Sequence, residues 1–120
     1  MKTVVIGASP NPNRYAYRVT EMLVEEGIET IPLGVRSGEI AGLQIVDLKA
    51  QPPLEDVHTV TLYLGPDKQE PYYQYILSLN PQRIIFNPGT ENPHFQSLAI
   101  DNGIHAEYAC TLVMLSVNTY

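Results

Sequence analysis

Hydrophobic residues along the chain follow two spacings, which predict buried strands alternating with amphipathic helices. Short β-branched runs that end at a glycine or a polar turn are typical of strands in a parallel sheet, because both faces of such strands are buried. Six runs of this kind occur, at residues 2–7, 28–35, 44–47, 58–65, 83–87 and 104–109.

Apolar residues that recur three or four positions apart between these runs predict helices. Ala16, Val19 and Leu23 share one face of the first helix, and Asn92 is placed to cap the last. The three predicted helices span residues 13–26, 67–80 and 93–102. Residues 110–116 are apolar, but they are too few for their spacing to distinguish a helix from a strand.

Strands separated by helices predict right-handed crossovers and a parallel sheet with helices on both faces. The expected fold class is therefore α/β, a three-layer, doubly wound domain that spans residues 1–120. Ligands bind such sheets outside the carboxyl ends of the strands. We expect four loops that follow strands to meet at this edge: GASPNPNR, GVRSG, LGPD and NPGTENP.

Composition narrows the class of protein. The 120 residues, 44% of them apolar, suit one globular domain with a core of its own. No apolar run approaches the length of a membrane span, and the first residues do not form a secretory signal, so we expect a cytoplasmic protein. Cys110 is the only cysteine and the histidines are scattered, which argues against a disulfide and against a metal site.

Charge narrows the class of ligand. Seven basic and thirteen acidic side chains give a formal net charge of −6, which argues against nucleic acid as a partner. A small anionic ligand remains possible, since backbone amides and one arginine suffice to hold a phosphate.

The first loop, residues 7–14, is a candidate phosphate-binding loop. Gly7 and Ala8 are small enough for a diphosphate to approach the backbone, and the following helix would present free amides and its positive end. Ser9 and Asn13 offer polar groups, although either could instead cap the helix of an ordinary turn. The loop matches neither GxGxxG nor the P-loop pattern.

The second loop indicates whether the ribose of a bound nucleotide would carry a phosphate. An NAD-binding domain places an acidic residue at the end of its second strand, whereas this chain has Val35 and Arg36 after Gly34. An arginine there suits a phosphorylated ribose, as in NADP or CoA. The alternative is an exposed Arg36 paired with Glu39.

In order, the segments VIGAS, PLGVRSGEIAG, TLYLGP, IIFNPGTEN and ACTLVML resemble the small stand-alone CoA-binding domain family. The chain is also similar to the N-terminal CoA-binding domain of the succinyl-CoA synthetase α-subunit. The resemblance implies a Rossmann-like domain with a five-stranded parallel sheet of order 3-2-1-4-5. It further implies that CoA or an acyl-CoA lies across the loops, without catalytic machinery, because the phosphohistidine domain and partner subunit of the synthetase lie outside the resemblance.

Carried over by position, the resemblance implies contacts from all four loops. Tyr15, beside the first loop, could also line the site. The expected ligand-contacting residues are Gly7, Ala8, Ser9, Asn13, Arg14, Tyr15, Val35, Arg36, Leu64, Gly65, Pro66, Asn87, Pro88 and Gly89. Family members often carry Asn-Pro after the second strand, where this chain has Gly34-Val35.

Two further features leave alternatives open. Cys110 could form a mixed disulfide with a CoA thiol, or it could be a small buried residue. Tyr72, Tyr73 and Tyr75 crowd one helix, where one of them could face another subunit or a protein partner. Arg36 after the second strand keeps a second hypothesis open, an NADP-linked oxidoreductase or nucleotide-sugar enzyme. The tyrosine-rich helix suits a third, an oligomeric interaction module that has lost nucleotide binding.

Overall fold

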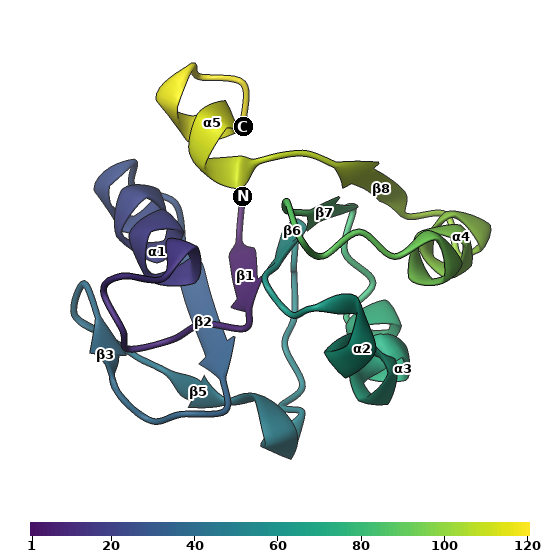
Figure 1. Cartoon of the computed structure of the whole chain (residues 1–120), viewed down its shortest axis with the longest axis horizontal. Helices are drawn as coiled ribbons and strands as arrows, with labels where there is room; N and C mark the ends of the chain where they lie inside the picture. The colour runs from purple at the N-terminus through teal and green to yellow at the C-terminus, as the bar shows by residue number, and fades with distance from the viewer.

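The structure is a computed structural model that describes residues 1–120. A main sheet lies between two layers of helices, and two short strands form a separate hairpin (Figure 1). The strands are β1 (Thr3–Ile6), β2 (Thr30–Gly34), β3 (Glu39–Ile40), β4 (Leu43–Gln44), β5 (Val46–Asp47), β6 (Thr59–Leu62), β7 (Arg83–Phe86) and β8 (His105–Tyr108). The helices are α1 (Tyr15–Glu25), α2 (Pro66–Gln69), α3 (Tyr73–Ser78), α4 (Pro93–Asp101) and α5 (Thr111–Ser116), with short 3-10 turns η1 (Leu48–Ala50) and η2 (Glu70–Tyr72). None of these helices is both long and apolar enough to cross a membrane.

The main sheet has six parallel strands in the order β5-β2-β1-β6-β7-β8. Counted along the chain, this order is 3-2-1-4-5-6, the order of doubly wound sheets that bind dinucleotides. The five-stranded sheet of order 3-2-1-4-5 is therefore wrong, because β8 adds a strand beside β7. The ring of Tyr108 in β8 packs edge-on against Phe86 in β7, which helps to hold this added edge strand.

Two predicted elements are divided in the structure. The helix expected over residues 67–80 is split into α2, η2 and α3, and Pro71 lies within η2. Proline has no amide hydrogen, so a continuous helical ladder cannot pass through it. The strand expected over residues 44–47 is also split, since β4 pairs with β3 in a separate hairpin and β5 joins the main sheet. Residues 111–116, which the spacing left undecided, form helix α5.

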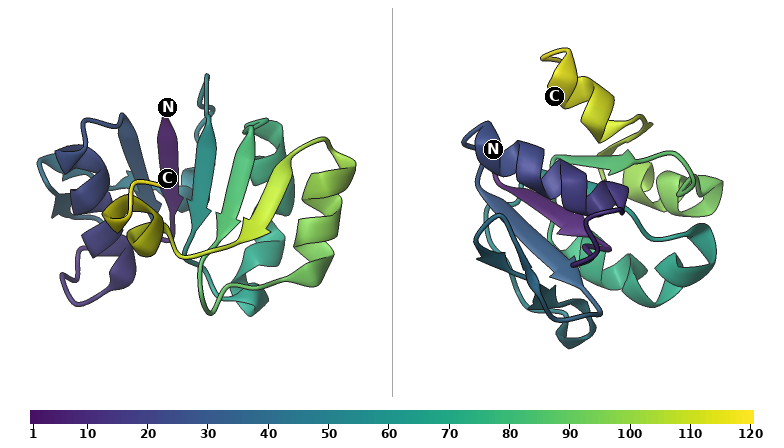
Figure 2. Two further views of the ribbon diagram at one scale, coloured as in Figure 1. Left: turned by 90° about the horizontal axis from the view of Figure 1, so that it is seen from above. Right: turned by 60° about the vertical axis from the view of Figure 1, so that its left-hand side comes forward.

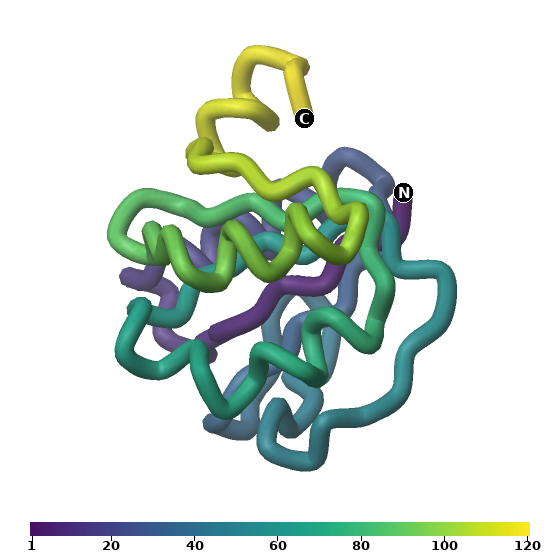
Figure 3. Tube along the Cα trace, turned by 90° about the vertical axis from the view of Figure 1, so that its right-hand side faces the viewer, coloured from purple at the N-terminus to yellow at the C-terminus, as the bar shows by residue number.

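Helices cover both faces of the sheet. Helices α1 and α5 lie on one face and α2, α3 and α4 on the other, so that α5 stands at the opposite side of the molecule from α2 and α3 (Figures 2 and 3). Alternation along β1 sends Val4 and Ile6 into the larger core cluster and Val5 into the smaller one beneath α1. The same alternation therefore supplies two cores from one strand.

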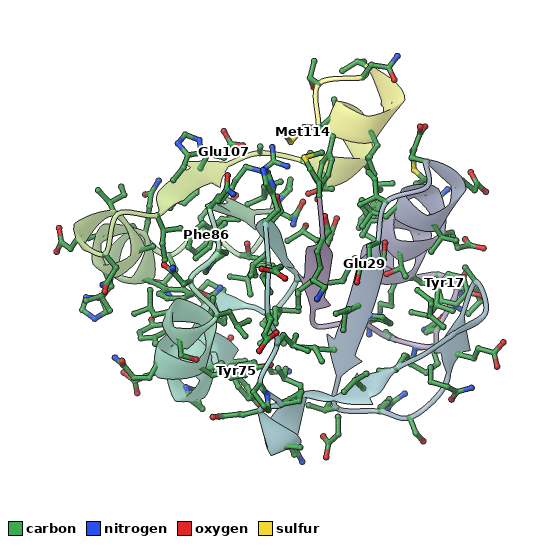
Figure 4. All side chains as sticks on the ribbon, turned by 180° about the vertical axis from the view of Figure 1, so that it is seen from behind. Tyr17, Glu29, Tyr75, Phe86, Glu107 and Met114 are labelled. Atoms are coloured by element: carbon green, nitrogen blue, oxygen red, sulfur yellow. The ribbon has the colours of Figure 1, made fainter.

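The tyrosines of the α3 region pack within their own chain. Tyr75 belongs to α3 (Figure 4). It is buried, and its hydroxyl donates to the Pro52 carbonyl oxygen at 2.6 Å. The ring of Tyr73 stacks on Phe95 with centroids 4.3 Å apart, and its hydroxyl accepts from Asn92. Asn92 also caps α4 as expected, because its side chain accepts from the Phe95 amide.

We predict that Gly34→Ala destabilises the fold by at least about 2 kcal/mol, the cost of overpacking a close contact. A Cβ atom at Gly34 would lie 2.2 Å from the Ala8 carbonyl oxygen, so the first loop would have to move. Urea unfolding measures the effect. Gly27→Ala is the control, since a Cβ atom at Gly27 would meet no other atom. The positive φ of 74° should alone cost this alanine variant about 1–2 kcal/mol of stability. A cost at Gly34 no larger than at Gly27 would contradict the prediction.

Candidate functional site

The ends of β1, β2, β6 and β7 surround one cleft of about 490 Å³ at the carboxyl edge of the sheet. The predicted residues that line this cleft are Gly7, Ala8, Ser9, Arg14, Tyr15, Val35, Arg36, Leu64, Gly65, Pro88 and Gly89. Asn13, Pro66, Asn87 and Cys110 do not line it. The four loops therefore meet at one place, as parallel strands require.

The first loop is held tightly against the neighbouring strands. The amides of Gly7 and Ala8 both donate to the Leu33 carbonyl oxygen, each at 2.9 Å. Gly7 has φ +98°, and a Cβ atom there would lie 2.9 Å from the Tyr63 carbonyl carbon. Only glycine fits this position without strain. The chain thus turns sharply at the end of β1 and runs along the cleft towards α1.

The N-terminus of α1 opens onto the cleft without a side-chain cap. The Ser9 hydroxyl accepts from the Asn11 amide, and the Asn13 amide donates to the Asn11 side chain, so neither Ser9 nor Asn13 caps the helix. The amides of Tyr15 and Ala16 donate to no acceptor of the chain, and both residues line the cleft. Free amides at the positive end of a helix are a site for an anion.

The charged side chains that line the cleft are all basic. Arg14, Arg36 and Lys68 line it, and no Asp or Glu does. Glu39, the alternative partner for Arg36, instead accepts from Gln44, and the only ion pairs in the chain are Lys2–Glu29 and His105–Glu107. The alternative of an Arg36–Glu39 pair is therefore wrong. The guanidinium of Arg36 is free of protein partners at the cleft edge.

Asn87 holds the fold together from beneath the cleft. It is 1% exposed, and its amide nitrogen donates to the Thr61 hydroxyl at 2.8 Å and to the Leu62 carbonyl at 2.9 Å. Its side-chain oxygen accepts from the Thr111 amide at 2.9 Å. The amide nitrogen and the oxygen of the Asn87 side chain are both bonded within the protein. Asn87 therefore positions α5 and the loop that follows β7, and it does not reach the cleft.

Gln69 joins two walls of the cleft. Its side chain is fully buried, and the amide nitrogen donates to the Leu64 carbonyl at 2.9 Å and to the Thr90 carbonyl at 2.8 Å. Its oxygen accepts from Asn92 at 3.0 Å. The loops after β6 and β7 are thereby held at a fixed separation. The sequence carries no signal for this role, since a glutamine in a polar helix is ordinarily exposed.

Tyr63 forms part of the cleft wall towards α5. Burial raises the pKa of its phenol, and the neighbouring Cys110 raises it further, so the phenol stays protonated at neutral pH. Cys110 itself is half-buried just before α5 and lies outside the cleft lining. The structure therefore does not bring the thiol into the cleft.

Several lining residues escaped the sequence analysis. They are Asn11, Ala16, Leu48, Tyr63, Lys68 and Thr90. Asn11 and Thr90 lie inside two of the four predicted loops, and Tyr63 directly precedes a third. Taking every polar residue of the loops, with one flanking residue, would have found all three. Lys68 lies in α2, directly after the loop LGPD, and the sequence carries no signal for its place at the cleft.

The family model of the CoA binding domain matches residues 1–116. The chain belongs to this CoA-binding domain family. Membership, which the order of the segments predicted, is thus confirmed. A search of curated proteins gave no match.

Solved structures agree with this family fold. The crystal structure of an uncharacterized protein is 49% identical, with a TM-score of 0.95 over 99% of this chain and 97% of that chain. A protein from Thermus thermophilus is 21% identical, with a TM-score of 0.83 over 99% of this chain and 90% of that one. A conserved hypothetical protein from Pyrococcus furiosus is 22% identical, with a TM-score of 0.81 over 93% and 97%. The last two show the fold alone.

We predict that Gln69→Leu lowers the free energy of unfolding by about 2–4 kcal/mol, because it leaves buried carbonyls of Leu64 and Thr90 without a donor. Urea unfolding tests this value. The matched control is Gln44→Leu, since Gln44 is exposed and bonds only a surface carboxylate, and its change should stay within about 0.5 kcal/mol. Equal effects of the two substitutions would show that the buried bridge does not stabilise the loops.

Proposed function

We propose that this CoA-binding domain holds CoA or an acyl-CoA in the cleft at the carboxyl edge of its sheet. One observation carries the proposal: a protein of net charge −6 places Arg14, Arg36 and Lys68, of only seven basic residues, around one cleft without acidic side chains. Such an arrangement favours a ligand with several negative charges. CoA carries a diphosphate and a ribose phosphate, and the family fold supports this ligand class.

The residues of the cleft suit the parts of CoA in order along the sheet edge. The free amides of Tyr15 and Ala16, with Arg14 beside them, suit the diphosphate. Arg36 suits the ribose phosphate, because a guanidinium can bind two phosphate oxygens at once. The pantetheine arm would then follow the small residues of the β6 and β7 loops, among them Gly65.

The chemistry of the lining supports binding without catalysis. The cleft is lined by no His, Cys, Asp or Glu, the residues most often used as acids, bases or nucleophiles. Its polar side chains are instead three cations, two tyrosines and a few short polar residues, groups suited to holding an anionic ligand. We infer a carrier, sensor or regulatory role for the bound ligand.

We predict that saturating CoA raises the melting temperature by several degrees. Ligand at about 100 times its dissociation constant adds about 2.7 kcal/mol to the stability of a one-site protein. Differential scanning fluorimetry with CoA, dephospho-CoA and NADP measures the effect. A larger shift with NADP than with CoA would favour the NADP-linked enzyme, and no shift with any of the three would favour an interaction module.

We predict that Arg36→Gln weakens CoA binding at least about tenfold, the loss of one charge-assisted contact of about 1.5 kcal/mol. Dephospho-CoA lacks the ribose phosphate, so Arg36→Gln should bind dephospho-CoA with the same affinity as the original protein does. Isothermal titration calorimetry with both ligands measures the difference. Lys49→Gln is the control, because it removes one exposed positive charge outside the cleft lining. An equal loss for both ligands would place Arg36 elsewhere than at the ribose phosphate.

A further inference from the structure

The charged residues of α1 are distributed in the opposite order to the one that the helix dipole favours. Arg14 and Arg18 lie at its N-terminal end, whereas Glu21, Glu25 and Glu26 lie in its C-terminal half or just beyond it. The first turn contains no acidic residue and the last turn no basic one. A helix dipole favours the reverse distribution, so this order costs stability in an isolated helix. Arg14 has a use at the cleft, but the charges beyond it have none there.

These unexplained charges share one stripe of the helix. Arg18, Glu21 and Glu25 are spaced by three and four residues, and all three border a shallow groove between α1 and α5. None of them forms an ion pair within the chain. Helices α1 and α5 lie side by side at this surface, on the face away from α2 and α3 (Figure 2).

The floor of the groove and the neighbouring surface are apolar. Met22 of α1 and Leu112 and Val113 of α5 line the groove between the charged residues. Val113 is 56% exposed, and Val117, four residues further on, is 57% exposed. Side chains four residues apart on a helical path lie next to each other, so the two valines extend the apolar floor to solvent. The face thus combines exposed apolar side chains with charged residues of both signs, a composition that suits a protein interface.

We propose that this α1–α5 face is the interface of a symmetric homodimer, in which α1 packs antiparallel to α1 of a second copy. A two-fold axis near Met22 would bring Arg18 of each copy opposite the acidic end of the other helix. Arg18 and Glu25 are seven residues apart, about 10.5 Å along the axis, so one pair forms on each side of Met22. In this antiparallel arrangement the dipoles of the two helices also point in opposite directions. The positive end of each helix then lies near the acidic residues of the other, which offsets the unfavourable order of charges within each helix.

The charge order favours a second copy over an unrelated partner. A two-fold interface is self-complementary, which requires one surface to carry both charge signs at matched distances from the axis. The stripe Arg18–Met22–Glu25 meets this requirement by itself. The proposal does not depend on CoA, because the groove and the cleft share no lining residue.

Analytical ultracentrifugation over a range of protein concentrations tests the dimer. We expect a reversible monomer–dimer equilibrium. Arg18→Glu and Glu25→Arg each place like charges opposite one another, and each should raise the dimer dissociation constant at least about tenfold. The double variant Arg18→Glu/Glu25→Arg exchanges the two signs and should restore dimerisation to near the original value.

Two controls make the result decisive. Lys49→Glu makes the same charge change as Arg18→Glu from η1, away from this face, and should leave the equilibrium unchanged. Far-UV circular dichroism and the CoA-induced melting shift verify that each variant is folded, and they also keep a failure of CoA binding separate from a failure of the dimer. A protein that is monomeric at every concentration would overturn the proposal. A dimer that is indifferent to both single reversals, or a double variant that stays monomeric, would overturn the Arg18–Glu25 pairing.

Discussion

The site depends on how closely β1 and β2 approach each other at their carboxyl ends. Gly7 and Ala8 donate to one carbonyl oxygen of Leu33, while Gly34 leaves no room for a side chain beside the Ala8 carbonyl. These backbone contacts fix where the first loop leaves the sheet. The start of α1, its free amides and Arg14 then follow from the path of that loop. A small displacement at Gly34 would therefore move the first loop and the N-terminal end of α1 together.

Buried amide side chains stabilise the rest of the cleft. Gln69 holds the loops after β6 and β7 together, and Asn87 attaches the second of these loops to β6 and to the start of α5. Each amide satisfies several backbone groups at once, which spares the loops the cost of buried unpaired carbonyls. The cleft walls are thus positioned before any ligand arrives. A preformed site loses less entropy on binding than one that must be ordered by its ligand.

Electrostatics separates this cleft from the remainder of the surface. The acidic residues that give the protein its net charge lie outside the cleft lining, and three cations lie within it. Local charge and net charge therefore have opposite signs, which makes an acidic protein compatible with the anionic ligand that we propose. The α1 helix takes part in both surfaces, since its beginning borders the cleft and its middle borders the groove with α5.

The sequence by itself determined the class of the fold and the edge where the cleft lies. Alternating strands and helices predict a parallel sheet, and turn residues after each strand mark its carboxyl edge. It could not give the break at Pro71, because the apolar spacing continues across the proline. The run at residues 104–109 predicted a strand, but only its pairing with β7 placed that strand in the main sheet as β8.

The tertiary structure alone decided which polar side chains face the cleft. Asn87 turns inward and Lys68 returns to the edge, although sequence position favoured the opposite assignment. The physical reason is that spacing along a chain specifies the side of a strand or helix on which a residue lies. Whether that side meets a ligand, a buried carbonyl or another helix depends on segments distant in the sequence.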